Sequence, residues 1–147
     1  MRRSKVGLMT SIAIVDSGPL LAAANRSDPD HAACLATLRE TKYRLVIPAM
    51  CVAEVSYFLG RRQGAELEAR FLQGLEEFDV RAPGAAEWPR IAELVRRYGD
   101  FPLGGTDASV ITLAERLDTE TIITLDHRHF GRVKPRHVKR FTLLPAR

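Results

Sequence analysis

The chain has 147 residues, a formal net charge of +4, 46% hydrophobic residues and 27% charged residues. This length suits one domain with its own core, and the composition excludes a disordered or collagen-like chain. The two cysteines, Cys34 and Cys51, exclude a disulfide framework, and neither has the close cysteine neighbour that a zinc knuckle requires. We therefore expect a single domain over residues 9–147 in a reducing cytoplasm, preceded by a disordered extension at residues 1–8.

The first residues raise the question of a secretory leader, because Arg2, Arg3 and Lys5 precede an apolar stretch. Asp16 interrupts that stretch, and the Ser-Gly-Pro sequence after it predicts a turn. A short buried strand is therefore favoured over a signal peptide. No segment reaches the roughly 20 apolar residues that a membrane span needs.

Short β-branched runs alternate with longer helical patterns along the whole chain. In the helical patterns, apolar residues stand three and four positions apart, as at Val110, Leu113 and Ala114. This alternation predicts a mostly parallel sheet covered by helices on both faces, with ligands bound beyond the carboxyl ends of the strands. The predicted elements, in chain order, are strand 12–15, helices 19–24 and 31–41, strand 44–48, helices 49–60 and 65–77, strand 79–81, helices 85–98 and 107–116, and strands 121–125 and 141–144.

Three large apolar features are assigned to the core. Phe130 is predicted to anchor the core, and Trp88 to pack at a helix start. The apolar face of helix 65–77 is also predicted to be core, with part of it available for a dimer interface. Its residues are Leu67, Phe71, Leu72 and Leu75.

Carboxylates stand where ligands bind in such a sheet. Asp16 directly follows strand 12–15, and Asp126 directly follows strand 121–125. Asp107 opens a helix, and Glu54 lies five residues into helix 49–60, so we expect all four to reach one edge. Taken alone, each aspartate also suits a helix cap or a turn. Glu54 stands among apolar neighbours, where an unpaired charge is costly, so it needs a partner.

Four crowded carboxylates would raise one another's pKa unless a cation held them. Hard divalent ions such as Mg²⁺ and Mn²⁺ prefer oxygen ligands, and they activate water for attack on a phosphodiester. The acids therefore favour a metal-dependent nuclease. Zinc is the alternative, since His31, Cys34, His127 and His129 are zinc-ligand types, but their spacing matches no metal finger.

Four short segments carry a resemblance to a known family. They are IVDSGPLL at 14–21, VIP at 46–48 followed by VAEV at 52–55, DAS at 107–109, and TLDHRHF at 124–130. In this order and spacing, the chain resembles a PIN domain over about residues 12–133, and more narrowly the VapC toxins of VapBC toxin-antitoxin modules. One segment would be a weak signal, whereas the ordered set is specific.

The resemblance implies a three-layer α/β/α sandwich and a metal-dependent endoribonuclease. It places Asp16, Glu54, Asp107 and Asp126 in the acidic site, with Asp16 and Asp107 as direct ligands of Mg²⁺ or Mn²⁺. Thr124 matches a hydroxyl position that orients the site. The resemblance also implies homodimers, and inhibition by a VapB antitoxin whose C-terminal segment enters the groove. The residues before Met9 extend beyond the usual toxin start, which suggests Met9 as the true start.

Basic residues are the candidates for holding RNA, because phosphate contacts dominate nucleic-acid affinity. Residues 126–147 hold seven of the 22 Lys and Arg but one of the 18 acids, an asymmetry that can attract a polyanion. A solvated surface or a strip for an acidic partner explains the asymmetry equally well. Arg128 is expected nearest the cut. The other candidates are Arg132, Lys134, Arg136, Lys139, Arg140, Arg61 and Arg62.

Two other functions stay open. A phosphatase of the haloacid-dehalogenase kind also begins with an aspartate after a strand, but it needs a second aspartate where this chain has Gly18. A non-catalytic RNA-binding scaffold could keep the fold without activity. Retention of all four acids argues against the scaffold, because a mutually repelling cluster without a function is costly.

Overall fold

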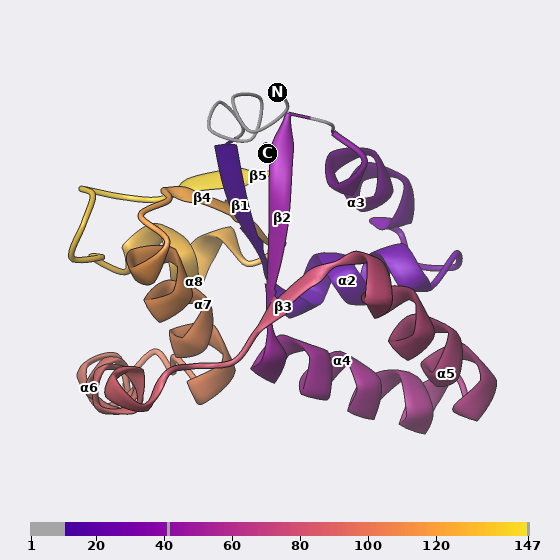
Figure 1. The fold of residues 1–147 in the computed structure, drawn as a ribbon, viewed down its shortest axis with the longest axis horizontal. Helices are drawn as coiled ribbons and strands as arrows, with labels where there is room; N and C mark the ends of the chain where they lie inside the picture. The colour runs from indigo at the N-terminus through magenta and orange to yellow at the C-terminus, as the bar shows by residue number, and fades with distance from the viewer. Residues whose placement is uncertain (1–10, 41, 147) are drawn as a thin grey trace, which may run out of the picture.

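A five-stranded, all-parallel sheet forms the centre of the molecule (Figure 1). The computed structural model describes residues 11–40 and 42–146, so the predicted extension at 1–8 and the alternative start at Met9 lie outside the described residues. The strand order is β3-β2-β1-β4-β5. The strands are β1 (Ser11–Val15), β2 (Tyr43–Pro48), β3 (Asp79–Arg81), β4 (Thr121–Ile123) and β5 (Thr142–Leu144).

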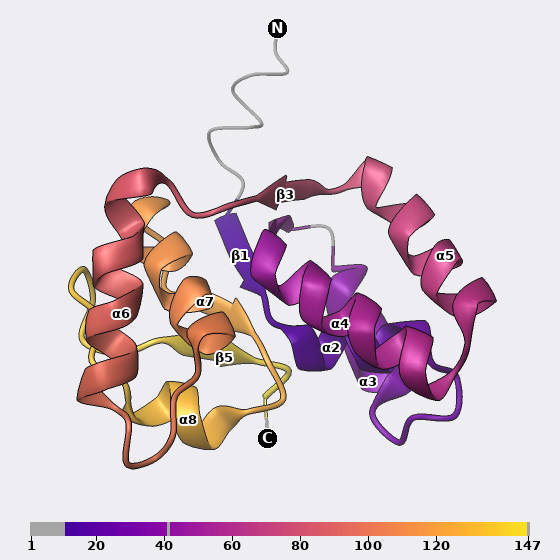
Figure 2. The same cartoon turned by 90° about the horizontal axis from the view of Figure 1, so that it is seen from below.

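Helices cover the sheet on both sides, which confirms the predicted α/β/α sandwich. In both views, α2, α3 and α5 lie on one side of β1 and β2, and α6, α7 and α8 lie on the other (Figures 1 and 2). Their bounds are α2 (Ser17–Ala24), α3 (His31–Leu38), α4 (Ala49–Arg62), α5 (Ala65–Gly74), α6 (Trp88–Arg97), α7 (Gly105–Arg116) and α8 (His127–Arg132). Short 3₁₀ turns, Leu75–Glu77 and Ala85–Glu87, precede β3 and α6. No helix of the described residues is long and apolar enough to cross a bilayer.

The centre of the core lies where β1 meets α7. Ala13, Ile14 and Val15 on β1 are fully buried, and every residue of α7 from Ala108 to Ala114 is buried. The chain runs from β1 outward through β2 to β3 and then returns to the other side of β1 for β4. This reversal of strand order places a topological switch point at the carboxyl ends of β1 and β4, here called the crevice, which is the position where doubly wound sheets bind ligands.

Two apolar predictions need correction, whereas Phe130 is fully buried as predicted. Trp88 begins α6 but is 48% exposed, so it does not pack into the core. On α5 no residue is fully buried. The apolar face of α5 packs only partly on the core because it also lines an open groove, described below.

Candidate active site

Asp16 lies at the centre of the crevice. Its backbone N–H donates to the Ile123 carbonyl (2.9 Å), which extends the β1–β4 pairing to the strand end. The side chain is buried, and Thr124 Oγ1 donates to Asp16 Oδ2 (2.8 Å). Burial raises the pKa of Asp16 to about 6, while the hydrogen bonds from Thr124 and from the Ser17 backbone oppose this increase.

Thr124 connects two of the acids. The Thr124 hydroxyl that donates to Asp16 also accepts the backbone N–H of Asp126 (2.9 Å). Thr124 is fully buried directly after β4, so its rotamer is held by its surroundings. The hydroxyl position expected from the resemblance therefore contacts Asp16.

Asp107 and Glu54 face the same crevice from two helices. Asp107 is the third residue of α7, and its Oδ2 accepts the Gly104 N–H (3.4 Å) at the helix start. Burial raises the pKa of Asp107, and the charges of Asp126 and Glu54 raise it further. Glu54 also acts on Asp16, so its carboxylate lies within electrostatic reach of both aspartates. The three acids therefore lie within electrostatic reach of one another, although no three such side chains of the described residues are close enough to hold one ion together.

Asp126 is also at this edge, but its oxygens are already engaged. It caps α8, with Oδ1 accepting the backbone N–H of His129 (3.0 Å) and Oδ2 lying 2.7 Å from His129 Nδ1. The carboxylate raises the pKa of His129. Asp126 therefore combines the expected site position with the structural role of an N-cap.

Cys51 was not among the expected site residues. Its Sγ lies 3.9 Å from Asp16 Oδ1, and burial raises the pKa of the thiol, which keeps it protonated. The sequence contains a signal for this placement, because Cys51 precedes Glu54 by three residues and so shares its side of α4. The protonated Cys51 thiol therefore donates a weak hydrogen bond to Asp16 Oδ1.

The donor chemistry of the crevice fits a hard divalent cation. Asp16, Glu54 and Asp107 offer only oxygen donors, and no ion pair engages them within residues 11–40 and 42–146. In the described part of the chain, no three His, Cys, Asp or Glu side chains are close enough to hold an ion together. Mg²⁺ does not need such a cage, because it commonly uses one or two carboxylates and keeps several waters.

The residues of the zinc alternative do not gather. His31 Nδ1 bonds to the Ala22 carbonyl (2.9 Å), while His129 is held by Asp126. The described residues therefore give no support to a zinc site.

The predicted RNA-binding residues fall into two groups. Arg128 is exposed on α8 two residues after Asp126, and Arg132 on the same helix lies over the Phe101 ring (4.7 Å). Lys134 follows α8 and is exposed, with its backbone N–H donating to the Tyr98 hydroxyl (3.1 Å).

The remaining basic candidates lie away from the acids or are already paired. Arg61 and Arg62 stand in the last turn of α4, roughly 10–12 Å along the helix axis from Glu54. They pack over the rings of Tyr57 and Phe58. Arg136 pairs with Glu93 (3.1 Å), while Lys139 and Arg140 are exposed near the C-terminal end.

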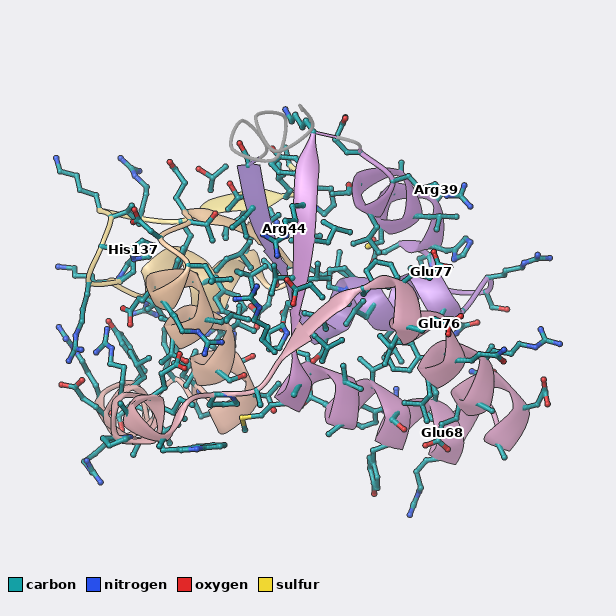
Figure 3. All side chains as sticks on the ribbon, viewed as in Figure 1. Arg39, Arg44, Glu68, Glu76, Glu77 and His137 are labelled. Carbon is teal, nitrogen blue, oxygen red and sulfur yellow. The ribbon has the colours of Figure 1, made fainter. Side chains whose placement is uncertain are left out.

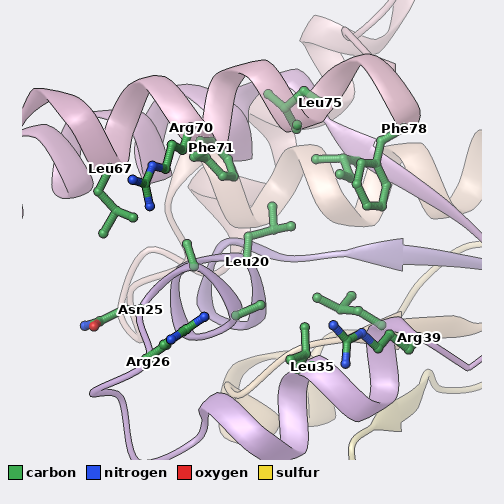
Figure 4. A pocket seen from close by; sticks show the side chains of 15 residues that line it. Leu20, Asn25, Arg26, Leu35, Arg39, Leu67, Arg70, Phe71, Leu75 and Phe78 are labelled. Atoms are coloured by element: carbon green, nitrogen blue, oxygen red, sulfur yellow. The ribbon is translucent and has the colours of Figure 1, made fainter.

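An apolar groove of about 760 Å³ lies between α2, α3 and α5, on the side of β1 and β2 opposite α7 (Figure 4). Apolar side chains from all three helices form its walls, including Leu20, Leu35 and Phe71. Arg26, Arg39 and Arg70 also line it. An apolar groove with cationic residues suits an amphipathic segment that carries acidic residues.

Comparisons with known proteins address the family and the fold. The PIN-domain family matches residues 13–134. The chain belongs to the PIN-domain family. It is 37% identical to Ribonuclease VapC26 of Mycobacterium tuberculosis over 134 residues, which are 90% of this chain and 99% of that relative. The family expected from the sequence is therefore confirmed.

Two solved structures share the fold. The crystal structure of Mycobacterium tuberculosis VapC20, described as a sarcin-ricin loop cleaving toxin, matches with a TM-score of 0.72 and 16% identity, covering 80% of this chain and 92% of that one. VapBC2 from Rickettsia felis, bound to a DNA fragment from its promoter, matches with a TM-score of 0.64 and 18% identity, covering 83% and 92%. At these identities the matches support the PIN fold alone.

Proposed function

We propose that this PIN-domain protein is an endoribonuclease toxin of the VapC kind, which hydrolyses RNA phosphodiester bonds to leave a 5′-phosphate and a 3′-hydroxyl. The observation that carries the proposal is the 37% identity to a ribonuclease over nearly the whole length of both chains. The charges support it, because Asp16, Asp107 and Glu54 influence one another electrostatically and none of the three forms an ion pair in the described part of the chain.

In this proposal Asp16 and Asp107 hold Mg²⁺ or Mn²⁺, with Glu54 beside them. When bound, such an ion supplies an acidified water and stabilises charge on the departing oxygen. Thr124 holds Asp16 in a fixed orientation through the 2.8 Å hydrogen bond and favours its charged form. Arg128, exposed beside the crevice, attracts the RNA backbone.

Cleavage of labelled RNA tests the proposal. We expect the purified protein to cut RNA with Mg²⁺ or Mn²⁺, to stop with EDTA, and to lose cleavage in Asp16→Asn. Glu66→Gln is the matched control, because Glu66 is an exposed carboxylate on α5 that pairs with Arg70 away from the crevice. Binding of RNA without cutting in any metal would favour the scaffold, and hydrolysis of a phosphomonoester alone would favour the phosphatase.

We also propose an antitoxin partner of the VapB kind, in line with the VapBC2 match, with an acidic amphipathic segment seated in the groove. Arg39→Glu and Phe71→Ala should leave RNA cleavage intact and reduce neutralisation by the co-expressed antitoxin. Trp88→Ser, which changes an exposed apolar side chain outside the groove, should be neutralised normally. Normal neutralisation of both groove variants would contradict this placement.

A homodimer remains part of the proposal. Sedimentation of the purified chain should give twice the mass of 16.4 kDa. A monomer at micromolar concentration would contradict it.

A further inference from the structure

His129 contacts both oxygens of Asp126 and a second chain segment at once. Its backbone N–H and its Nδ1 face Asp126 Oδ1 (3.0 Å) and Oδ2 (2.7 Å). Its Nε2 lies 2.8 Å from the Phe101 carbonyl oxygen. Nε2 therefore has a hydrogen-bond acceptor, whereas Nδ1 forms an ion pair with the Asp126 carboxylate outside hydrogen-bond geometry. An unprotonated Nδ1 would hold its lone pair beside that carboxylate, so the 2.7 Å contact favours the imidazolium.

The packing around the ring fixes this arrangement. The His129 and Phe101 rings meet edge to face, with centroids 4.7 Å apart and planes at 90°. The Arg132 guanidinium lies over the same Phe101 ring. Phe101 belongs to the segment between α6 and α7, and that segment leads into Asp107. His129 thus joins the strand end that carries Asp126 to the segment that positions Asp107.

We propose that His129 is a positioning residue of the ribonuclease site: its imidazolium keeps Asp126 as a paired carboxylate and fixes the Phe101 segment ahead of Asp107. This inference rests on the proposed function. His129 neutralises the charge of Asp126. The other three acids, Asp16, Glu54 and Asp107, have no ion-pair partner among the described residues and remain available to a divalent cation. The positive charge of the His129 imidazolium reduces the negative potential around the four acids. Its contacts with Asp126 and Phe101 hold the two chain segments in place.

The two effects predict opposite changes when the imidazole is removed. In His129→Phe the ring packing is retained, but Asp126 loses its cationic partner and keeps only the backbone N–H of residue 129. Binding of Mn²⁺ to the protein without RNA should then tighten several-fold, because the site gains one net negative charge. The kcat for RNA cleavage should fall at least tenfold, because Asp126 and the Phe101 segment are no longer held together. A residue that only packed would weaken both or change neither.

Calorimetric titration with Mn²⁺ and single-turnover cleavage measure the two effects. His129→Gln, which is neutral but polar, should move both in the same directions and serves if the Phe variant does not fold. Adding Asp126→Asn to His129→Phe should return Mn²⁺ affinity to that of the unsubstituted protein, because the net charge is restored. His137→Gln is the matched control, since His137 also bonds a backbone carbonyl, that of Thr119 (2.7 Å), and is labelled on the side of α7 that faces away from β1 and β2 (Figure 3).

Several results would overturn the inference. Unchanged or weaker Mn²⁺ binding in a folded His129→Phe protein would do so, as would absence of Mn²⁺ binding in all variants. Nitrogen chemical shifts of a neutral His129 ring at pH 7 would also overturn it. If the protein cut no RNA while Mn²⁺ affinity still rose in His129→Phe, the proposed function would fail, but the positioning of the cation site by His129 would stand.

Discussion

Thr124 Oγ1 donates a 2.8 Å hydrogen bond to Asp16 Oδ2, and the same oxygen accepts the backbone N–H of Asp126 at 2.9 Å. One hydroxyl therefore links the carboxylate after β1 to the acid after β4. Because it is fully buried, neither partner can exchange it for bulk water.

Replacing Thr124 by Val should impair both partners. Asp16 loses a hydrogen bond that lowers its pKa, so the acidic limb of the cleavage pH profile should move to higher pH. The free energy of unfolding should fall by about 2 kcal/mol, since a charged group and a buried N–H lose their partner. Thr124→Ser, which keeps the hydroxyl, should restore the pH profile. An unchanged acidic limb in the Val variant would argue against this role.

Asp16→Asn should abolish cleavage and stabilise the fold. The pKa of Asp16 is about 6 in the folded protein against an ordinary 3.8, so the folded state binds more protons between those values. The contribution of Asp16 to stability is therefore favourable at low pH and is lost as the pH rises to about 6. Asn carries no charge, so the variant should gain up to about 3 kcal/mol over the parent protein at pH 8 and little at pH 3. Urea unfolding at both pH values measures this. A variant that is less stable at pH 8 would refute the assignment of a buried, uncompensated charge.

Divalent ions should stabilise the folded protein in a pH-dependent way. At saturating Mn²⁺ and pH 7.5 the melting temperature should rise by several degrees, because a ligand at 100 times its Kd contributes about 2.7 kcal/mol. At pH 5 the shift should shrink, since Asp16 is largely protonated there. Asp16→Asn should show little shift at either pH. Scanning fluorimetry with and without EDTA is sufficient, and an equal shift in the Asn variant would place the ion elsewhere.

A large loss of stability is expected at Arg90, whose side chain is 9% exposed. It donates to Glu115 through Nε (3.1 Å) and Nη2 (2.8 Å), and to Glu93 through Nη1 (2.8 Å), which joins α6 to α7. Arg90→Ala leaves Glu115 buried and without this partner, so unfolding should become easier by about 3–5 kcal/mol. Arg70→Ala, which breaks an exposed pair with Glu66, should cost less than about 1 kcal/mol. Similar losses in the two variants would contradict the difference in burial.

All five strands were predicted, and for β1, β2 and β4 the reason is that β-branched runs bounded by turn residues identify buried parallel strands. The helix α8 was missed, since its six residues, HRHFGR, include only Phe130 as a buried apolar residue and show no periodicity. What begins this helix is the carboxylate cap of Asp126, a contact that depends on one rotamer.

Some features of the candidate site could likewise be predicted from the sequence, and others could not. The edge positions of Asp16 and Asp126 follow from parallel topology alone, as do those of the two helical acids. The pairing of His129 could not be predicted, because its second acceptor is the backbone carbonyl of Phe101, which no residue type reveals. The position of the apolar groove between α2, α3 and α5 was not predicted either, since periodicity identifies the apolar face of α5 but not whether another element covers it.

The reversal of strand order at β1 has a consequence for synthesis on the ribosome. A nascent chain that has emerged only as far as α7 already carries Asp16, Glu54 and Asp107, yet it lacks β4 and therefore the Thr124 hydroxyl that orients Asp16. Until residue 126 has been translated and β4 has docked beside β1, the proposed nuclease is incomplete. Synthesis of the chain is therefore separated in time from the proposed activity of the finished protein.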